Sequence, residues 1–146
     1  MKQFPAAALI LLFFFIPALS QSTQDIERAF LQNNPDLLLP HFPHHKHVMI
    51  SFPDPIDFSD QMTDQQAFLF FKKIFSAFAT FEFYTESFPL RPEGNHFIFQ
   101  TRWSFRNRRN KNQNVFMIFF SLTKEPSPEK RGLPEWIITE IKAEKI

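Results

Sequence analysis

The sequence predicts an α+β fold in which a curved antiparallel sheet packs on about three helices. Helical spacing and helix-capping residues are concentrated in the first half of the chain, whereas apolar and polar residues alternate almost continuously through the second half. The chain also holds 22 phenylalanines against two glycines, and aromatic residues favour strands. Helices followed by a run of strands with short turns indicate a sheet covered on one face.

Three helical segments are predicted before the run of strands. Asp25 is placed to cap a short helix that ends at Asn33-Asn34-Pro35, and Pro35 suits the start of a second short helix from Asp36 to Phe42. Thr63-Asp64-Gln65-Gln66 forms a capping box that begins a third helix, expected to run to about Ala79. Apolar residues on this helix extend beyond one stripe, so we expect it to be covered on more than one side.

One early strand and a four-strand meander are predicted to make the sheet. The early strand alternates through Val48, Ile50 and Phe52, and Pro53 and Pro55 close it. Turn-forming residues separate the four later strands, which are expected from Phe81 to Phe88, from His96 to Arg106, from Val115 to Thr123 and from Trp136 to Ala143.

Alternation predicts which side chains face the helices. A hairpin centred near residue 110 would pair Trp103 with Met117, and it would keep the odd-numbered residues of both strands on one face. The expected lining of a pocket between sheet and helices is then Phe71, Phe97, Phe99, Trp103 and Met117.

The preceding strand is expected to follow the same parity. Phe81 and Phe83 would then lie inside, and Glu82 would oppose Arg102 on the outer face. The only tyrosine of the chain, Tyr84, also falls on the outer face. The inward set of the three strands from Phe81 to Thr123 therefore contains no acid, histidine or tyrosine.

The strand from Val115 to Thr123 is apolar on both faces. With the register given above, Phe116, Ile118 and Phe120 would lie on the outer surface of the sheet beside Ile98. A large exposed apolar patch is typical of a contact surface, so we interpret these four residues as a homodimer interface or a partner site. The alternative is a central strand that is only shaded by long neighbouring side chains such as Arg102.

The first 20 residues have the pattern of a signal peptide. Lys2 precedes an apolar run from Ala6 to Ile16, and the small residues of Pro17-Ala18-Leu19-Ser20 suit cleavage after Ser20. The predicted mature chain is one domain from 21 to 146, periplasmic or secreted, without an integral membrane segment. Because the chain has no cysteine, a disulfide framework and lipid attachment through a cysteine are excluded.

Charge and composition argue against nucleic acid as a partner. Without Lys2 the chain has equal numbers of basic and acidic residues, so no global field attracts a polyanion. The basic run Arg106, Arg108, Arg109 and Lys111 lies at a predicted hairpin tip with no aromatic residue for stacking bases. A solvated loop is therefore favoured over a site for phosphate or anionic polysaccharide.

Two groups of residues are candidates for chemistry. His41, His44, His45 and His47 lie close together in the sequence, but their spacing is not specific for zinc, nickel or copper, and we predict no metal. Asp54, Asp57 and Asp60 precede the third helix, where acids beside prolines usually make turns. We predict no catalytic residue and no cofactor.

The order of elements resembles the nuclear transport factor two-like (cystatin-like cone) superfamily. Segments that carry the resemblance are Ile26 to Phe30 with Asn33-Asn34, Leu38 to Phe42, Met62-Thr63 before a Phe-rich helix, and Trp136 to Lys142. They look like small exported bacterial domains of unknown function in that superfamily. The resemblance implies a first strand beside the last, a cone-shaped pocket and frequent dimerisation through the sheet.

Two functional hypotheses remain, together with a third possibility in which the domain binds no ligand. The favoured hypothesis is an exported noncatalytic domain that forms a homodimer and binds an apolar small molecule or an envelope protein. The alternative, implied by relatives of the ketosteroid isomerase and dehydratase type, is a small lyase or isomerase using Asp54, Asp57 or Asp60 at the cone mouth. The third possibility is that phenylalanines simply fill the cone.

Overall fold

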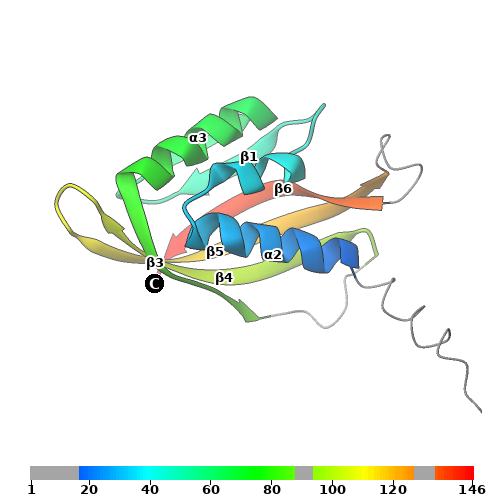
Figure 1. Ribbon diagram of the computed structural model, residues 1–146. Helices are drawn as coiled ribbons and strands as arrows, with labels where there is room; N and C mark the ends of the chain where they lie inside the picture. Colours follow the sequence, from blue (N-terminus) through cyan, green and yellow to red (C-terminus); the bar gives the residue numbers. More distant parts are fainter. Residues whose placement is uncertain (1–16, 88–93, 127–133) are drawn as a thin grey trace, which may run out of the picture.

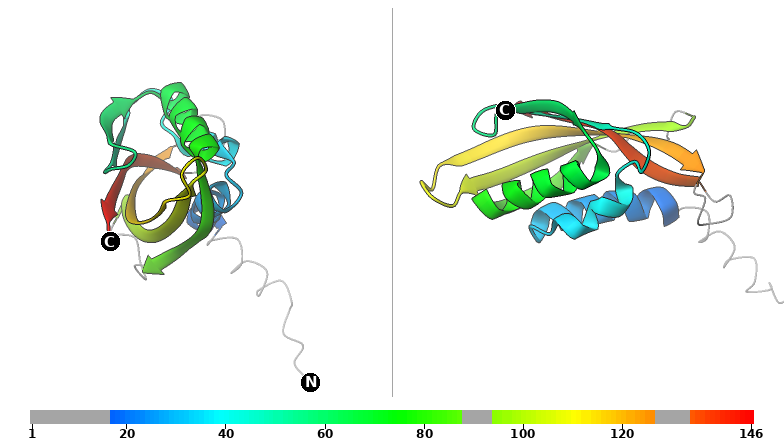
Figure 2. Two further views of the ribbon diagram at one scale, coloured as in Figure 1. Left: turned by 90° about the vertical axis from the view of Figure 1, so that its left-hand side faces the viewer. Right: turned by 90° about the horizontal axis from the view of Figure 1, so that it is seen from above.

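The computed structural model describes residues 17–87, 94–126 and 134–146. One six-stranded sheet in the order β2-β1-β6-β5-β4-β3 curves without closing, and the helices pack on one of its faces (Figures 1 and 2). This is the predicted α+β architecture. The elements are α2 (Pro17–Leu31), the 3-10 turns η2 (Pro35–Leu37) and η3 (Leu39–His41), β1 (Val48–Phe52), β2 (Phe58–Met62), α3 (Asp64–Ala77), β3 (Phe78–Ser87), β4 (His96–Asn107), β5 (Gln113–Pro126) and β6 (Pro134–Lys145).

The capping box at the start of α3 is confirmed. The Gln66 amide donates to the Thr63 hydroxyl at 3.2 Å, and the Thr63 amide donates to Oε1 of Gln66 at 3.0 Å. Buried residues of α3 include Phe71, Ile74 and Phe75, which face the sheet. No helix in the described ranges combines the length and apolar character needed to cross a membrane.

The N-terminal helices differ from the prediction in their ends. Asp25 does not cap α2, because the helix already begins at Pro17. Asn33, with a φ of 50°, adopts the left-handed conformation that ends many helices, and the Asn34 amide donates to the Ala29 carbonyl at 2.8 Å. The predicted second helix is two short 3-10 turns, since Pro40 interrupts it.

The sheet has one strand more than predicted. Residues 58–62 form β2, an edge strand antiparallel to β1, where a loop was expected. Its three central residues are exposed and polar, so apolar and polar residues do not alternate along this strand. β1 lies beside β6 in parallel, with Ile50 opposite Ile141, which agrees with the first strand lying beside the last.

The register of the β4–β5 hairpin differs by one residue from the prediction. Trp103 pairs with Phe116, not with Met117. A shift of one residue reverses the faces of a strand, so the predicted outer-face position of Phe116, Ile118 and Phe120 is wrong. All three side chains are fully buried against the helices.

A bulge in β3 changes the predicted parity of that strand. The pairing with β4 shifts between Thr80 and Glu82, so Phe81 is 56% exposed instead of buried. Glu82 lies opposite Ser104, not opposite Arg102 as predicted. Beyond the bulge, Phe83 is buried as expected.

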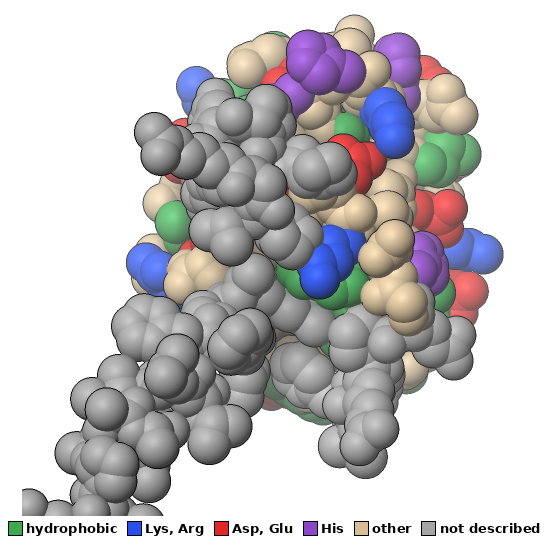
Figure 3. Space-filling model, turned by 90° about the vertical axis from the view of Figure 1, so that its right-hand side faces the viewer, with side chains coloured by type: hydrophobic (Ala, Val, Ile, Leu, Met, Phe, Trp, Pro, Cys, Tyr) green, Lys and Arg blue, Asp and Glu red, His purple; other side chains and the backbone are tan. Residues whose placement is uncertain are grey.

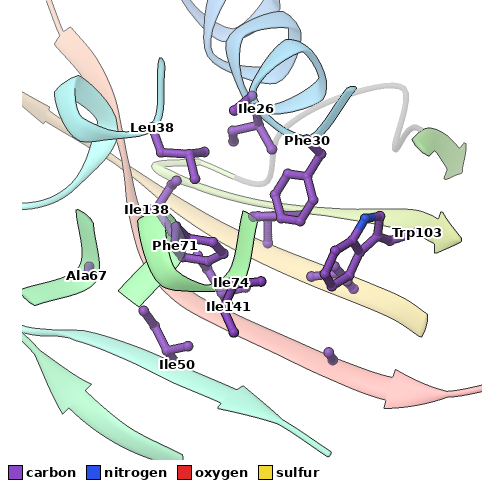
Figure 4. Packing of buried hydrophobic residues seen from close by; sticks show 14 of the residues in the cluster. Ile26, Phe30, Leu38, Ile50, Ala67, Phe71, Ile74, Trp103, Ile138 and Ile141 are labelled. Carbon is purple, nitrogen blue, oxygen red and sulfur yellow. The ribbon is translucent and has the colours of Figure 1, made fainter. Parts of the chain in front are cut away.

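The core lies between the sheet and both long helices. In Figure 4, Ile26, Phe30 and Leu38 project from the N-terminal elements toward side chains of α3 and of the sheet. Phe30 is fully buried, and its ring contacts five aromatic rings of α3 and the sheet: Phe71, Phe75, Phe83, Trp103 and Phe120. The core therefore joins helices and strands through one aromatic centre.

Candidate binding site

Aromatic side chains fill the predicted cone. Phe71, Phe97, Phe99 and Trp103, which were predicted to line a pocket, are all buried. The Trp103 ring stacks on Phe105 at 3.8 Å between centroids, and Phe99 stacks on Phe120 at 5.0 Å. The correction of the β5 register adds the even-numbered residues of β5 to this interior. Inward side chains thus pack on one another where a pocket was predicted.

Met117 does not line the cone. It pairs with Arg102 on the outer face of the sheet, and its sulfur accepts from Nε2 of Gln100 at 2.9 Å. The inclusion of Met117 among the pocket residues is therefore wrong. The one-residue error in the hairpin register that placed Phe116 on the outer face also placed Met117 on the inner face.

Polar side chains on the inner face of the sheet have hydrogen-bond partners. The Thr101 hydroxyl donates to the Ile118 carbonyl at 3.1 Å, and Nε1 of Trp103 donates to the Thr80 hydroxyl at 2.8 Å. Among the described residues, His41 is the only ionisable side chain that is buried. The inner face of the sheet therefore offers hydrophobic packing, and the polar side chains Thr101 and Trp103 on it are hydrogen-bonded.

His41 and Asp25 form a part-buried pair that joins η3 to α2. Nε2 of His41 lies 2.9 Å from Oδ2 of Asp25, so the ring N–H belongs on Nε2 and donates to the carboxylate. Nδ1 of His41 is buried and has no hydrogen-bond partner in the described structure. Asp25 also accepts from Nε2 of Gln21 at 2.8 Å. This arrangement holds the N-terminal helix against the 3-10 turns.

The other histidines of the predicted cluster separate in space. His44 lies 3.5 Å from Asp64 at the start of α3, while His45 and His47 are exposed. Figure 3 shows histidine side chains at separate places on this face of the molecule. Within the described ranges, no three His, Cys, Asp or Glu side chains come together as a metal site would require.

The three candidate acids lie at the β1–β2 hairpin. Asp54 and Asp57 occupy its turn, and Asp60 lies in β2, all three exposed. Oδ1 of Asp60 accepts from the Gln61 amide at 2.7 Å, so this carboxylate turns toward its own strand edge. The structure does not bring the three acids together.

The basic hairpin tip contains one residue with a structural contact. Nη2 of Arg108 donates to the Phe75 carbonyl at 3.2 Å, and the Arg108 amide donates to the Ala77 carbonyl at 3.0 Å. Both acceptors are carbonyls of the last turn of α3, where a cation is favourable, and the Phe75 carbonyl also accepts from Nδ2 of Asn33 at 3.4 Å. Arg108 therefore anchors the β4–β5 hairpin, shown at the left of Figure 1, to the helix.

We expect Arg108→Ala to lower the free energy of unfolding by about 1 kcal/mol, because it removes one hydrogen bond and one favourable charge at a helix end. Urea denaturation measures the change. Arg109→Ala is the matched control, since the Arg109 side chain makes no hydrogen bond or ion pair within the described residues, and we expect it to have no effect. Equal losses in both variants would contradict the anchoring role.

The outer face of the sheet carries a different set of apolar residues from the predicted one. Ile98 is 47% exposed there, as expected, and Tyr84 also lies on this face. The β5 residues on it are Val115, Met117 and Phe119, each half-buried. The outer face of β5 is thus also apolar, but its residues are the odd-numbered ones that alternate with Phe116, Ile118 and Phe120.

An open apolar groove lies between β2 and α3, outside the cone. It has a volume of about 430 Å³, and its lining is Ile56, Phe58, Met62, Gln66, Leu69, Phe70, Lys73 and Ile74. Sequence reasoning missed this groove, because β2 was predicted as a loop. One signal was present: Leu69 widens the apolar stripe of α3, and it is 59% exposed.

A second hollow, of about 360 Å³, lies on a different side of α3. It is bounded by Asn33, Lys72 and Arg108 among others, and its walls include Phe68 and Phe75. Nδ2 of Asn33 donates to the Phe78 carbonyl at 3.1 Å, which ties the end of α2 to the start of β3. The polar groups of this hollow therefore serve contacts between elements.

Comparison with known proteins identifies the fold. No family model matches the chain, and no curated protein matches it. A DUF4783 family protein from Bacteroides ovatus has a TM-score of 0.62 at 16% identity, over 84% of this chain and 93% of its own. A ketosteroid isomerase-like protein from Erwinia carotovora atroseptica has a TM-score of 0.63 at 11% identity, over 91% and 98%.

An NTF2-like protein from Cytophaga hutchinsonii is similar over 98% of this chain and 100% of its own, with a TM-score of 0.58 at 10% identity. At such identities the likeness concerns the fold, and one fold serves catalytic and noncatalytic proteins alike. The order of strands, the helices on one face and these similarities agree with the resemblance seen in the sequence. The chain has the NTF2-like, cystatin-like cone fold.

Proposed function

We propose that this chain is an exported, noncatalytic binding domain that takes an apolar small molecule and dimerises through the outer face of its sheet. The packed interior supports the noncatalytic part of this proposal, because the inward residues of the sheet are apolar or hydrogen-bonded. General acid–base chemistry needs an ionisable group beside the substrate. The exposed positions of Asp54, Asp57 and Asp60 do not favour the lyase or isomerase alternative.

Export rests on the signal-peptide pattern of the first 20 residues. Cleavage after Ser20 would make Gln21 the new N-terminus and would shorten α2, which begins at Pro17. Asp25, which holds His41, would stay in the mature chain. The fold-stabilising contacts of α2 described above therefore lie on the retained side of the cleavage site.

Dimerisation rests on the composition of the outer face. Met117 lies in the central apolar row of this face, and the sheet register places Arg102 on one side of it and Glu144 on the other. No ion pair joins either charge to another side chain within the described residues. A charged pair that flanks an apolar centre is suited to a symmetric contact with a second copy.

The register also defines how two copies would fit. A two-fold axis parallel to β5 and midway between two stacked sheets places the β4 side of one copy over the β6 side of the other. Arg102 of one copy then faces Glu144 of the second, twice per dimer, and Met117 meets its counterpart. Face-to-face sheets commonly align within about 30°, so this arrangement is compatible with ordinary sheet packing.

Native mass spectrometry of the protein purified from its own envelope tests the proposal. We expect a dimer of chains that begin at Gln21, with a retained apolar molecule. Arg102→Glu and Glu144→Arg should each give monomers, because each places like charges opposite one another, and the double exchange should restore the dimer. Arg109→Glu at the hairpin tip is the control and should stay dimeric.

The outcomes separate the parts of the proposal. A bare monomer in the wild type would contradict both dimerisation and ligand binding. If the Arg102→Glu and Glu144→Arg variants both stayed dimeric, this interface would be contradicted. A protomer that keeps residues 1–20 would contradict export with cleavage.

A further inference from the structure

The groove between β2 and α3 has two apolar walls and a closed floor. Phe58 and Met62 come from β2, and Leu69 comes from α3. Phe70 forms the floor, since its ring lies 4.7 Å from Phe58 and 5.8 Å from Phe52 between centroids. The floor separates the groove from the filled cone, so a ligand would lie along the surface of α3.

The size and exposure of the groove suit a small apolar ligand. Its volume of about 430 Å³ falls within the range of small-molecule sites. Leu69 presents most of its side chain to solvent inside this groove, at 59% exposure. Covering Leu69 would remove apolar surface from water and would favour binding.

The free edge of β2 is less suited to an added peptide strand. The Gln61 amide is already satisfied by Oδ1 of Asp60, and the Thr63 amide by Oε1 of Gln66. β2 is also only five residues long. Short edges with occupied donors discourage strand pairing, so we argue for a small molecule and not for a peptide.

Charge at the ends of the groove defines the ligand further. Gln66 and Lys73 both line it and lie seven residues apart on α3, which is about 10 Å along the helix axis. Within the described residues the Lys73 ammonium makes no ion pair. Lys73 is therefore a free cation at one end of an apolar groove.

We propose that this groove binds a monocarboxylate amphiphile such as a fatty acid, with the acyl chain along Leu69 and Phe70 and the carboxylate on the Lys73 ammonium. The inference rests on the proposed function, because it names the site and the class of the apolar ligand. It places the ligand outside the cone, where neither Phe97 nor Phe99 touches it.

Isothermal titration calorimetry of the mature chain with decanoate and with decanol tests this site. Lys73→Gln should weaken decanoate about fivefold and leave decanol unchanged, because only the carboxylate pairs with the ammonium. Leu69→Asp should weaken both ligands by roughly tenfold or more, since it places a charge in the apolar groove. Lys72→Gln, on the side of α3 that faces the other hollow, is the matched control and should change neither.

Each result has one meaning for the site and one for the proposed function. Binding of both ligands that is insensitive to Lys73 and Leu69 would overturn the groove and leave the apolar-ligand function standing. Failure of both ligands to bind the wild type would overturn both. Equal losses in Lys73→Gln and Lys72→Gln would overturn the specific ion pair. Circular dichroism of Leu69→Asp checks that this exposed substitution keeps the fold.

Discussion

Replacing Phe30 with alanine is expected to lower the free energy of unfolding by about 3–5 kcal/mol, as the loss of a fully buried aromatic side chain usually does. The Phe30 ring, from α2, touches both α3 and the strands: it contacts Phe71 of α3, stacks on Phe83 at 4.4 Å and meets Trp103 edge-on at 5.2 Å. Its removal leaves a cavity where helices and sheet meet, and the surrounding rings can close it only in part.

Urea denaturation followed by circular dichroism measures this loss as a lower midpoint at unchanged slope. The neighbouring residue supplies the control, because Leu31 is 49% exposed and Leu31→Ala should change stability by no more than about 0.5 kcal/mol. A loss of less than about 1 kcal/mol for Phe30→Ala would show that the aromatic centre does not hold the layers together.

Phe120→Ala and Phe119→Ala are expected to differ widely although the residues are adjacent. Phe120 is fully buried and stacks on Phe99, so its truncation should cost about 3–5 kcal/mol. Phe119 lies half-buried on the outer face opposite Gln100, and its truncation should cost about 1 kcal/mol or less. Denaturation at low protein concentration keeps any dimer contact of Phe119 out of the comparison.

This pair decides the register of the β4–β5 hairpin. If Phe119→Ala proved the more damaging substitution, the pairing of Trp103 with Met117 would be correct and the outer patch would return to Phe116, Ile118 and Phe120. The expected order supports Trp103 beside Phe116 instead.

Local signals in the sequence were sufficient for much of the fold. The capping box at Thr63 depends on two hydrogen bonds within four residues, and so it could be read directly. The inward face of β4 also followed from alternation alone, because Phe97, Phe99 and Trp103 stand two or four residues apart on a strand without a bulge.

The hairpin register could not be read in the same way. Its loop is fixed by the Asn107 side chain, which accepts from the Arg109 amide at 2.9 Å, and by the left-handed conformation of Lys111, with a φ of 66°. Many of the residues in this loop are Asn, Arg or Lys, so apolar periodicity gave no information on its length. An error of one residue in the length of this loop exchanged the two faces of β5. Residues that lie in the core were therefore predicted as an interface on the outer face.

The groove depended on an element that alternation could not reveal. The middle of β2 is exposed and polar, so only Phe58 and Met62 hinted at a strand. Without β2 the predicted fold had no second wall beside Leu69, so the binding pocket was predicted inside the cone. The filling of that interior was one of the possibilities open from the sequence, since so many phenylalanines can close a pocket.

The position of β6 in the sheet has a consequence for folding kinetics. β6 is the last strand of the chain, yet it lies between β1 and β5, and it alone joins the β1–β2 hairpin to the other strands. Contacts such as Ile50 with Ile141 close residues 50–141 into one loop, and contacts of such long range make folding slow. Until β6 is in place, the β1–β2 hairpin therefore has no strand through which to join the rest of the sheet.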